Sequence, residues 1–311
     1  MPKLFSRFFL VFLISIISVG CAQTAQSDAN NADPITVIDG AGETITLDGP
    51  AQRVVSLIPS NTEILFAVGA GEQVVGRDSF SDFPAAALDI PDIGGGFGEL
   101  DTETILLAEP DLILASEITP LDQVEALKTL GLTVYTLNDP VDFEGLFENI
   151  RTVATLVGRN TEAETLIASL STRLEAVNIA IAPLSYKPIV FYELDGTDPN
   201  APWTAGGGTF VDKVIATAGG FNLGSDLNGA YAQISIEEII QVNPDVILLG
   251  DAVWGGVTPE IVTARAGWDG LKAVQAQQIF PFDDNLVSRP GPRLIDGVEE
   301  MARLLHPGVL E

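Results

Sequence analysis

Residues 234–248 read Ile234-Ser-Ile-Glu-Glu-Ile-Ile-Gln-Val-Asn-Pro-Asp-Val-Ile-Leu248. This stretch is the best guide to the fold, because the same pattern occurs earlier in the chain. The earlier copy is Leu100-Asp-Thr-Glu-Thr-Ile-Leu-Leu-Ala-Glu-Pro-Asp-Leu-Ile-Leu114. In each copy an N-cap candidate, Asp101 or Ser235, precedes a short helix that a proline ends. An apolar strand follows, as in parallel sheets that are buried on both faces. Two distant copies predict two similar α/β lobes with a cleft between them.

Helices and strands are predicted to alternate through both halves of the chain, which favours a parallel sheet wrapped by helices in each lobe. A hairpin is predicted over residues 35–47, and a single helix over Thr161–Ile181. At 1.5 Å per residue this helix measures about 30 Å, long enough to join two small domains while allowing little hinge closure. The predicted organisation is an N-terminal lobe over 35–157, a linking helix within 158–183 and a C-terminal lobe over 184–311.

Residues 1–20 have the layout of a secretory signal, with basic residues before an apolar run. Ile17-Ser-Val-Gly-Cys21 resembles the lipobox of bacterial lipoproteins, with Ser18 where leucine is usual, and the resemblance implies lipidation of Cys21. The alternative is cleavage by an ordinary signal peptidase near Ala22 or Ala25. Residues 21–34 have the polar composition of a tether. We therefore expect an exported protein, periplasmic or on the cell surface, anchored to the membrane by lipid.

The composition narrows the function. With 43 acidic and 15 basic residues the net charge is -28, which argues against nucleic-acid binding because the sequence has no basic footprint to neutralise phosphates. This acidity suits a basic docking partner, or reflects the habitat of the source. The only histidine, His306, follows the last predicted helix, and Cys21 is the only cysteine, so neither catalysis nor a soft-metal site is supported. We expect a binding protein without a cofactor; the alternatives are an exported α/β hydrolase or transferase, and an adhesive surface protein.

Aromatic residues gather in loops that follow predicted strands. Ligands of open α/β sheets bind outside the carboxyl ends of the strands, where these loops emerge. The alternative for any single ring is that it folds back onto the core. Together they predict a broad, largely apolar cleft lined by Phe80, Phe83, Phe97, Trp203 and Tyr231.

A family resemblance covers the chain from about Arg53 to Leu305. It is carried by Arg53-Val-Val-Ser-Leu-Ile-Pro-Ser-Asn-Thr-Glu63, Ser79-Phe-Ser-Asp-Phe-Pro84, Glu103 with Pro110-Asp-Leu-Ile-Leu, Pro202-Trp-Thr-Ala-Gly206 and Ser288-Arg-Pro-Gly-Pro-Arg293. These motifs resemble the substrate-binding proteins of ABC importers for vitamin B12, iron-siderophores and haem, and most of all the members that bind cobalamin. The resemblance implies that cobalamin is the transported ligand. A ferric siderophore is the nearest alternative, and haem the next, with Tyr231 as its main candidate ligand.

The resemblance also implies roles for single residues. Aromatic side chains of the cobalamin binders contact the ligand at the positions of Phe80, Phe97, Trp203 and Tyr231. In the loop that closes over the corrinoid, Asn285 replaces an aspartate of the family and Arg289 keeps an arginine. We expect Arg289 to contact the ligand, although it could be a surface residue, and Arg293 to be structural.

Glu103 and Glu237 occupy equivalent positions of the repeat, in the first turn of each short helix. They correspond to the family's two acidic residues, one per lobe, that dock on arginines of the membrane permease. The expected partners are thus an ABC permease and ATPase complex, with the chain itself acting as a monomer. The alternative is that each carboxylate only stabilises the positive end of its helix, by about 0.3–1 kcal/mol.

Overall fold

The N-terminal lobe is built around a parallel four-stranded sheet with the order β4-β3-β5-β6. The computed structural model describes residues 33–96 and 98–310. Ahead of this sheet lies the predicted hairpin, an antiparallel pair of β1 (Ile35–Ile38) and β2 (Thr44–Leu47). The strands of the sheet are β3 (Val54–Ser56), β4 (Val74–Arg77), β5 (Leu112–Ser116) and β6 (Val134–Leu137).

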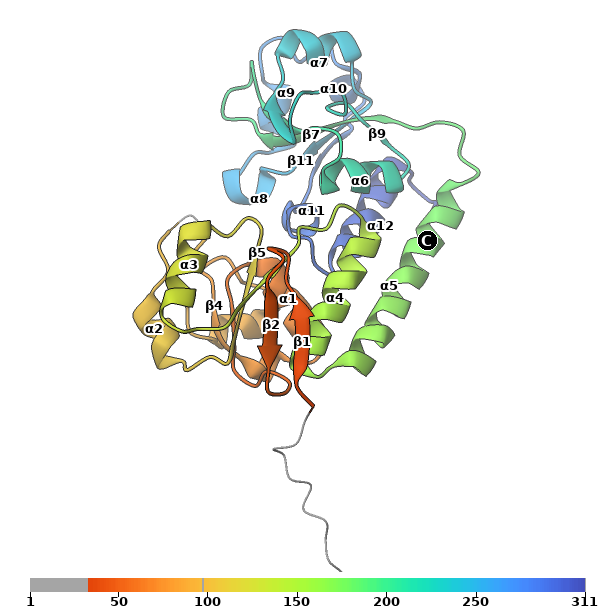
Figure 1. The fold of residues 1–311 in the computed structure, drawn as a ribbon. Coiled ribbons are helices and arrows are strands. Elements are labelled where there is room, and N and C mark those ends of the chain that lie inside the picture. The colour runs from red at the N-terminus through yellow and green to blue at the C-terminus, as the bar shows by residue number, and fades with distance from the viewer. Residues whose placement is uncertain (1–32, 97, 311) are drawn as a thin grey trace, which may run out of the picture. The chain divides into compact units, whose positions relative to one another are not determined.

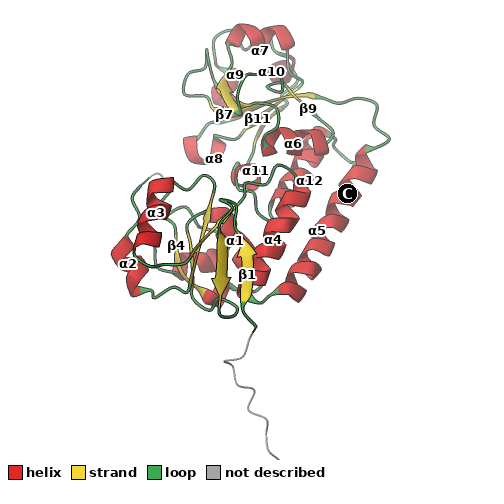
Figure 2. Ribbon diagram, in the orientation of Figure 1, coloured by secondary structure: helices red, strands yellow, loops and turns green. Residues whose placement is uncertain are grey.

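Helices cover both faces of this sheet, which is why its strands are mostly apolar. Neighbouring residues of one strand enter different cores: Val54 packs with α4, whereas Val55 packs with Ile105 of α2. In Figure 2 the strands lie between α2 and α3 on the left and α4 and α5 on the right. The helices of the lobe are α1 (Pro59–Ala67), α2 (Thr102–Leu107), α3 (Leu121–Thr129) and α4 (Phe143–Val157), with short 3-10 turns at Gly71–Gln73 and Ala85–Asp89.

The C-terminal lobe has a mixed sheet, which corrects the parallel arrangement predicted from the sequence. Along the order β10-β8-β7-β11-β12, strands β7, β11 and β12 are parallel, while β8 and β10 run antiparallel to their neighbours. β8 follows β7 after a short loop rather than a helical crossover, and only antiparallel pairing permits that. β10 comes later in the chain and pairs antiparallel with β8. The strands are β7 (Ile189–Asp195), β8 (Trp203–Ala205), β9 (Phe221–Asn222, paired with β7), β10 (Tyr231–Gln233), β11 (Val246–Leu249) and β12 (Ile279–Pro281).

Short helices surround the C-terminal sheet and leave its core strands buried on both faces. In β7, Val190 and Tyr192 enter one core and Phe191 the other. The helices are α6 (Phe210–Thr217), α7 (Ile236–Val242), α8 (Ala252–Gly255), α9 (Pro259–Thr263), α10 (Lys272–Gln275), α11 (Asn285–Ser288) and α12 (Leu294–Leu305). Within the described residues no helix has the length and apolar character needed to span a bilayer.

The linking helix α5 (Asn160–Ile181) is continuous, as the sequence predicted, and packs against both α4 and α12 (Figure 1). The Arg173 guanidinium joins it to α12 through ion pairs with Asp296 and Glu299. One hydrophobic core runs through α4, α5, α12 and α6. Both lobes and this helix therefore belong to a single compact unit, residues 33–311.

The two copies of the repeat fold alike, down to their caps. Asp101 accepts a hydrogen bond from Thr104 N–H, and Ser235 forms the predicted capping box with Glu238. The aspartates of the two Pro-Asp pairs also make equivalent hydrogen bonds. Asp111 accepts from Arg53 N–H before β3, and Asp245 accepts from Ile189 N–H at the start of β7. Each aspartate thus fixes the entry of the strand that neighbours its own.

Candidate functional site

The carboxyl ends of the parallel strands of the two lobes come together. Asp82 lies in the loop after β4, and Arg289 follows α11, which in turn follows β12. Arg289 Nη1 lies 2.5 Å from Asp82 Oδ1 and 3.9 Å from Glu63 Oε1 of α1. Since strands of both lobes end where these residues meet, the structure places the loops of the two lobes opposite one another.

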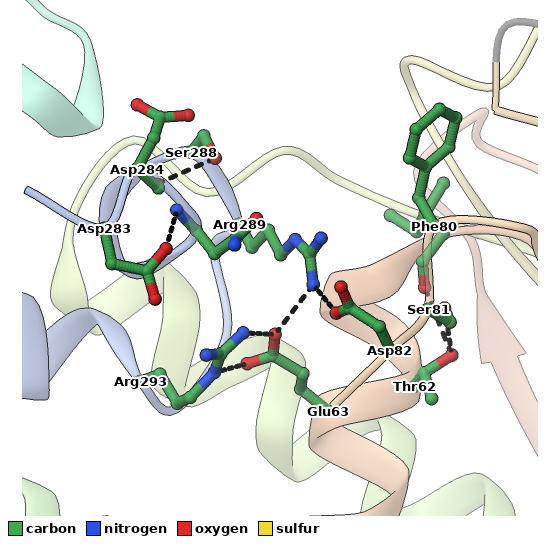
Figure 3. A network of polar contacts seen from close by, with 12 residues as sticks. Thr62, Glu63, Phe80, Ser81, Asp82, Asp283, Asp284, Ser288, Arg289 and Arg293 are labelled. Atoms are coloured by element: carbon green, nitrogen blue, oxygen red, sulfur yellow. Dashed lines mark hydrogen bonds and ion pairs between the residues drawn. The ribbon is translucent and has the colours of Figure 1, made fainter. Parts of the chain in front are cut away.

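Four residues, Glu63, Asp82, Arg289 and Arg293, form what we call the interlobe ion-pair cluster (Figure 3). Arg293, at the N-terminus of α12, donates two hydrogen bonds to the Glu63 carboxylate, of 3.0 and 2.5 Å. Burial raises the pKa of Glu63, and the hydrogen bonds from Arg293 oppose that rise. Such a bidentate pair is rigid as well as charged, so it fixes α1 relative to α12.

Hydrogen bonds beneath the cluster hold the loop that carries Phe80. Thr62 and Ser81 share a hydrogen bond of 2.8 Å between their hydroxyls, and Ser81 donates a second one to Asp78. Asp78 in turn accepts from the backbone N–H of Phe80, at 2.9 Å. Burial raises the pKa of Asp78, and these hydrogen bonds oppose that rise. The Phe80 ring projects away from the cluster in Figure 3 and is 45% exposed.

Trp203 and Tyr231 lie on the adjacent antiparallel strands β8 and β10. Tyr231 is paired with Ala205, two residues along from Trp203, so both aromatic side chains are on the same face of this ribbon. They are 42% and 55% exposed. Among the described residues the Tyr231 hydroxyl makes no hydrogen bond. Two aromatic surfaces are thus available side by side for a ligand.

The pKa of Tyr231 is affected by residues of both lobes. Its pKa is raised first by desolvation and then by the negative charges of Asp284, which follows β12, and Asp139, which follows β6. Burial raises the pKa of each of these carboxyls as well. Asp284 accepts a hydrogen bond from the buried Tyr192 hydroxyl, at 2.8 Å. The phenol therefore stands near acceptors from the N-terminal and the C-terminal lobe.

The other predicted ligand contacts are placed differently. Arg289 is only 12% exposed at its side chain and is engaged by Asp82 and Glu63. Asn285 opens α11 and is half-buried, and its side chain makes no hydrogen bond within the part of the chain that is described. Phe97, together with Cys21 and the predicted signal and tether up to residue 32, lies outside the described residues.

Phe83, the fifth ring predicted for the cleft, has a different setting. The Arg293 guanidinium stacks over it at 4.0 Å from the ring centroid. Phe83 lines a hollow of about 260 Å³ together with Phe66, Pro84 and Pro292, and neither Phe80, Trp203 nor Tyr231 takes part in it. The prediction of one hollow lined by all these rings is therefore wrong for Phe83, because the ring serves to cover the buried ion pair.

Glu103 and Glu237 are exposed in the first turns of α2 and α7, as expected. Four carboxylates of the site were not predicted from the sequence: Glu63, Asp82, Asp139 and Asp284. A signal was present for Glu63 and Asp82, since both lie inside the motifs Arg53–Glu63 and Ser79–Pro84. For Asp139 and Asp284 the signal was their position directly after strands β6 and β12.

Comparison with known proteins gives a match over the same region. The family model described as periplasmic binding protein matches residues 54–286. YvrC of Bacillus subtilis (strain 168), named as an uncharacterized ABC transporter substrate-binding lipoprotein, is 30% identical over 308 residues, covering 96% of this chain and 95% of YvrC. A cobalamin-binding protein of Halobacterium salinarum (strain ATCC 29341 / DSM 671 / R1) is 29% identical over 292 residues, covering 92% of this chain and 78% of that protein.

Solved structures share the two-lobed fold. The vitamin B12 binding protein BtuF of Vibrio cholerae superposes with a TM-score of 0.70 at 28% identity, covering 82% of this chain and 97% of BtuF. The apo form of the haem-binding protein RhuT from Roseiflexus sp. RS-1 gives a TM-score of 0.74 at 28% identity, covering 83% and 99%. These two proteins are named for different ligands, so the fold alone does not choose between them.

Proposed function

The chain belongs to the periplasmic binding protein family, and from this premise we propose that it binds a cobalamin between its lobes and delivers it to the permease of an ABC importer. It is a substrate-binding protein of the vitamin B12, haem and siderophore type. The choice of cobalamin rests on one observation. Among the described residues, exposed aromatic side chains at the carboxyl ends of the strands are accompanied by carboxylates and not by unpaired cations.

Cobalamin suits such a site. Its corrin ring is broad and its flat face is largely apolar, which favours contact with Phe80, Trp203 and Tyr231. The ring also carries peripheral amides, and carboxylates such as Asp139 and Asp284 can accept hydrogen bonds from their N–H groups. The names of relatives such as the Halobacterium salinarum protein support the same ligand.

Haem fits the electrostatics of Tyr231 less well. A tyrosine binds ferric iron as the phenolate, and burial or nearby negative charge that raises the phenol pKa disfavours that form. In this protein desolvation and the charges of Asp284 and Asp139 raise it. Ferric siderophores with carboxylate or catecholate groups are anionic and need free cations, whereas Arg289 and Arg293 are paired with acids.

Calorimetric titration of the purified protein with cyanocobalamin, hemin and ferric siderophores tests this choice. We expect cyanocobalamin to bind at least about tenfold more tightly than hemin, a difference of about 1.4 kcal/mol. Tyr231→Phe keeps the ring and removes the hydroxyl, so it should leave cyanocobalamin binding within about threefold. Cyanocobalamin that gives neither heat nor thermal stabilisation contradicts the proposal. A hemin complex whose visible spectrum changes in Tyr231→Phe supports the haem alternative.

We further propose that Glu103 and Glu237 dock on basic residues of the permease. Their exposure and their equivalent positions in the repeat suit a partner with two equivalent surfaces. The double variant Glu103→Lys/Glu237→Lys should bind ligand normally and fail to stimulate the ATPase of the reconstituted transporter. Glu175→Lys, on the exposed face of α5, is the matched control. Full stimulation by the double variant contradicts the docking role.

Export and lipidation at Cys21 complete the proposal. The name of YvrC as a lipoprotein supports an anchor of this kind. Mass spectrometry of the protein from membranes should find an N-terminal lipidated cysteine, and Cys21→Ser should release the protein from the membrane fraction. An unmodified N-terminus at Ala22 or Ala25 would instead identify ordinary signal cleavage.

A further inference from the structure

Trp254 is a large aromatic residue that the site described above does not use. It lies in α8, directly after the carboxyl end of β11, and its side chain is 61% exposed. Its neighbour Val253 is 67% exposed. In Figure 1, α8 lies at the lower edge of the C-terminal lobe, on the side of the N-terminal lobe. Two large apolar residues are thus exposed next to each other on this four-residue helix.

Buried contacts fix α8 next to the proposed ligand site. Asp251, which precedes α8, is buried, and its Oδ2 atom accepts a hydrogen bond of 2.8 Å from the N–H of Gly196. Gly196 follows Asp195, the last residue of β7, and Asp195 is the register partner of Trp203. Trp203 and Trp254 therefore flank the end of the same strand.

The first repeat has a similar feature at the equivalent place. The segment after β5 exposes two large apolar side chains, those of Ile118 and Leu121. Glu117 in this segment accepts a hydrogen bond of 3.3 Å from the N–H of Asp139, one of the two carboxylates near Tyr231. In both lobes, then, the segment after the repeated strand exposes two large apolar side chains and is held by a hydrogen bond at or next to the proposed site.

Exposed aromatic residues at the opposite end of the C-terminal sheet provide a contrast. Phe221 is paired with Ile189, the first residue of β7, and is 50% exposed. Tyr186 interacts with Asp245 just before β11. Both therefore lie at the amino ends of the parallel strands, where ligands of open α/β sheets do not bind.

We propose that Trp254, with Val253 beside it, contacts the bound corrinoid and extends the aromatic lining of the site past Trp203. The inference rests on the proposed function. Trp254 presents a flat face at the carboxyl end of β11, and the corrin ring is wide enough to reach beyond Trp203 across the end of β7. Because the residue is exposed in the free protein, it contributes to affinity without contributing to the folded core.

Affinity measurements on Trp254→Ala test the proposal. We expect its affinity for cyanocobalamin to be at least about tenfold weaker than that of the unchanged protein. Phe221→Ala, an equally exposed aromatic at the other end of the sheet, should stay within about twofold. Thermal unfolding of both free variants should match that of the unchanged protein, because neither side chain packs in the core.

Hydroxyl-radical footprinting of the unchanged protein gives a readout that needs no variant. Bound cyanocobalamin should protect the peptide that contains Trp254 and leave the peptide that contains Phe221 as reactive as before. If the protein binds cyanocobalamin but Trp254→Ala binds equally well, or Trp254 is not protected, this inference is overturned and the proposed function stands. If the unchanged protein does not bind cyanocobalamin, the proposed function and this inference are both wrong.

Discussion

Replacing Asp251 by asparagine should stabilise the protein in a way that depends on pH. Asp251 is buried, its Oδ1 atom has no hydrogen-bond partner among the described residues, and Glu193 with its own partner Arg265 lies nearby. Burial, and next the negative charge of Glu193, raise the pKa of Asp251 to about 6. Asp251→Asn keeps the shape of the side chain and removes the charge that is unfavourable there.

The direction of this pH dependence follows from how tightly the folded and unfolded chains bind a proton. The folded protein holds the proton of Asp251 more tightly than the unfolded chain does, so stability falls as pH rises from the ordinary value of 3.8 through about 6. A shift of this size corresponds to about 3 kcal/mol once the carboxyl is fully ionised. Roughly 1.4 kcal/mol of this loss falls between pH 5 and pH 8. Asp251→Asn should not show this part of the loss.

Urea unfolding of both proteins at several pH values from 5 to 8 measures the effect. Subtracting the two free energies of unfolding cancels the contributions of the other acidic residues, which are the same in both chains. Asp269→Asn, at an exposed aspartate, is the control and should give a difference that does not vary with pH. An Asp251→Asn difference that is equally independent of pH would refute the assignment of a raised pKa to this carboxyl.

Three further changes probe the contacts that hold the site and the repeat. Arg293→Met leaves the buried Glu63 carboxylate without its bidentate partner and should lower the free energy of unfolding by about 3–5 kcal/mol in urea titration. Adding Glu63→Leu to the same chain should restore much of this stability, and a double variant that stays as unstable contradicts the pairing. Arg289→Ala should cost less than about 1 kcal/mol in the same assay, because Asp82 is exposed and Glu63 keeps Arg293, so a loss as large as that of Arg293→Met would be unexpected. Ser235→Ala removes the capping box of α7 and should cost about 1 kcal/mol by thermal unfolding, and an unchanged midpoint would show that the cap is dispensable.

Much of the fold could be predicted because its signals are local. The hairpin before β3, the long helix α5 and the short helices of the two repeats depend on turn residues, caps and apolar periodicity within one segment. The antiparallel strands β8 and β10 could not be predicted in the same way. Each is three residues long, and its direction depends on which neighbour it pairs with, which no local pattern records.

The candidate site was predictable only in part, for the same reason. Trp203 and Tyr231 could be named because they lie in loops next to strands, and their shared face follows from the β8–β10 register. The engagement of Arg289 by Asp82 could not be anticipated, since the two residues are 207 positions apart. Trp254 follows the repeated strand β11 in the sequence, but its exposure is decided only by the packing of α8.

By itself the sequence determined that two copies of one helix–strand unit exist, where each begins and ends, and that acidic groups far outnumber basic ones. Caps, proline stops and strand hydrophobicity act over a few residues, so they can be recognised in a linear chain. The pairing of charged side chains and the exposure of the aromatic rings follow from the tertiary structure alone. The ion pairs and the exposure of the rings depend on contacts between residues of the two lobes. The packing of α4, α5 and α12 into one core fixes how the lobes lie and therefore which residues make these contacts.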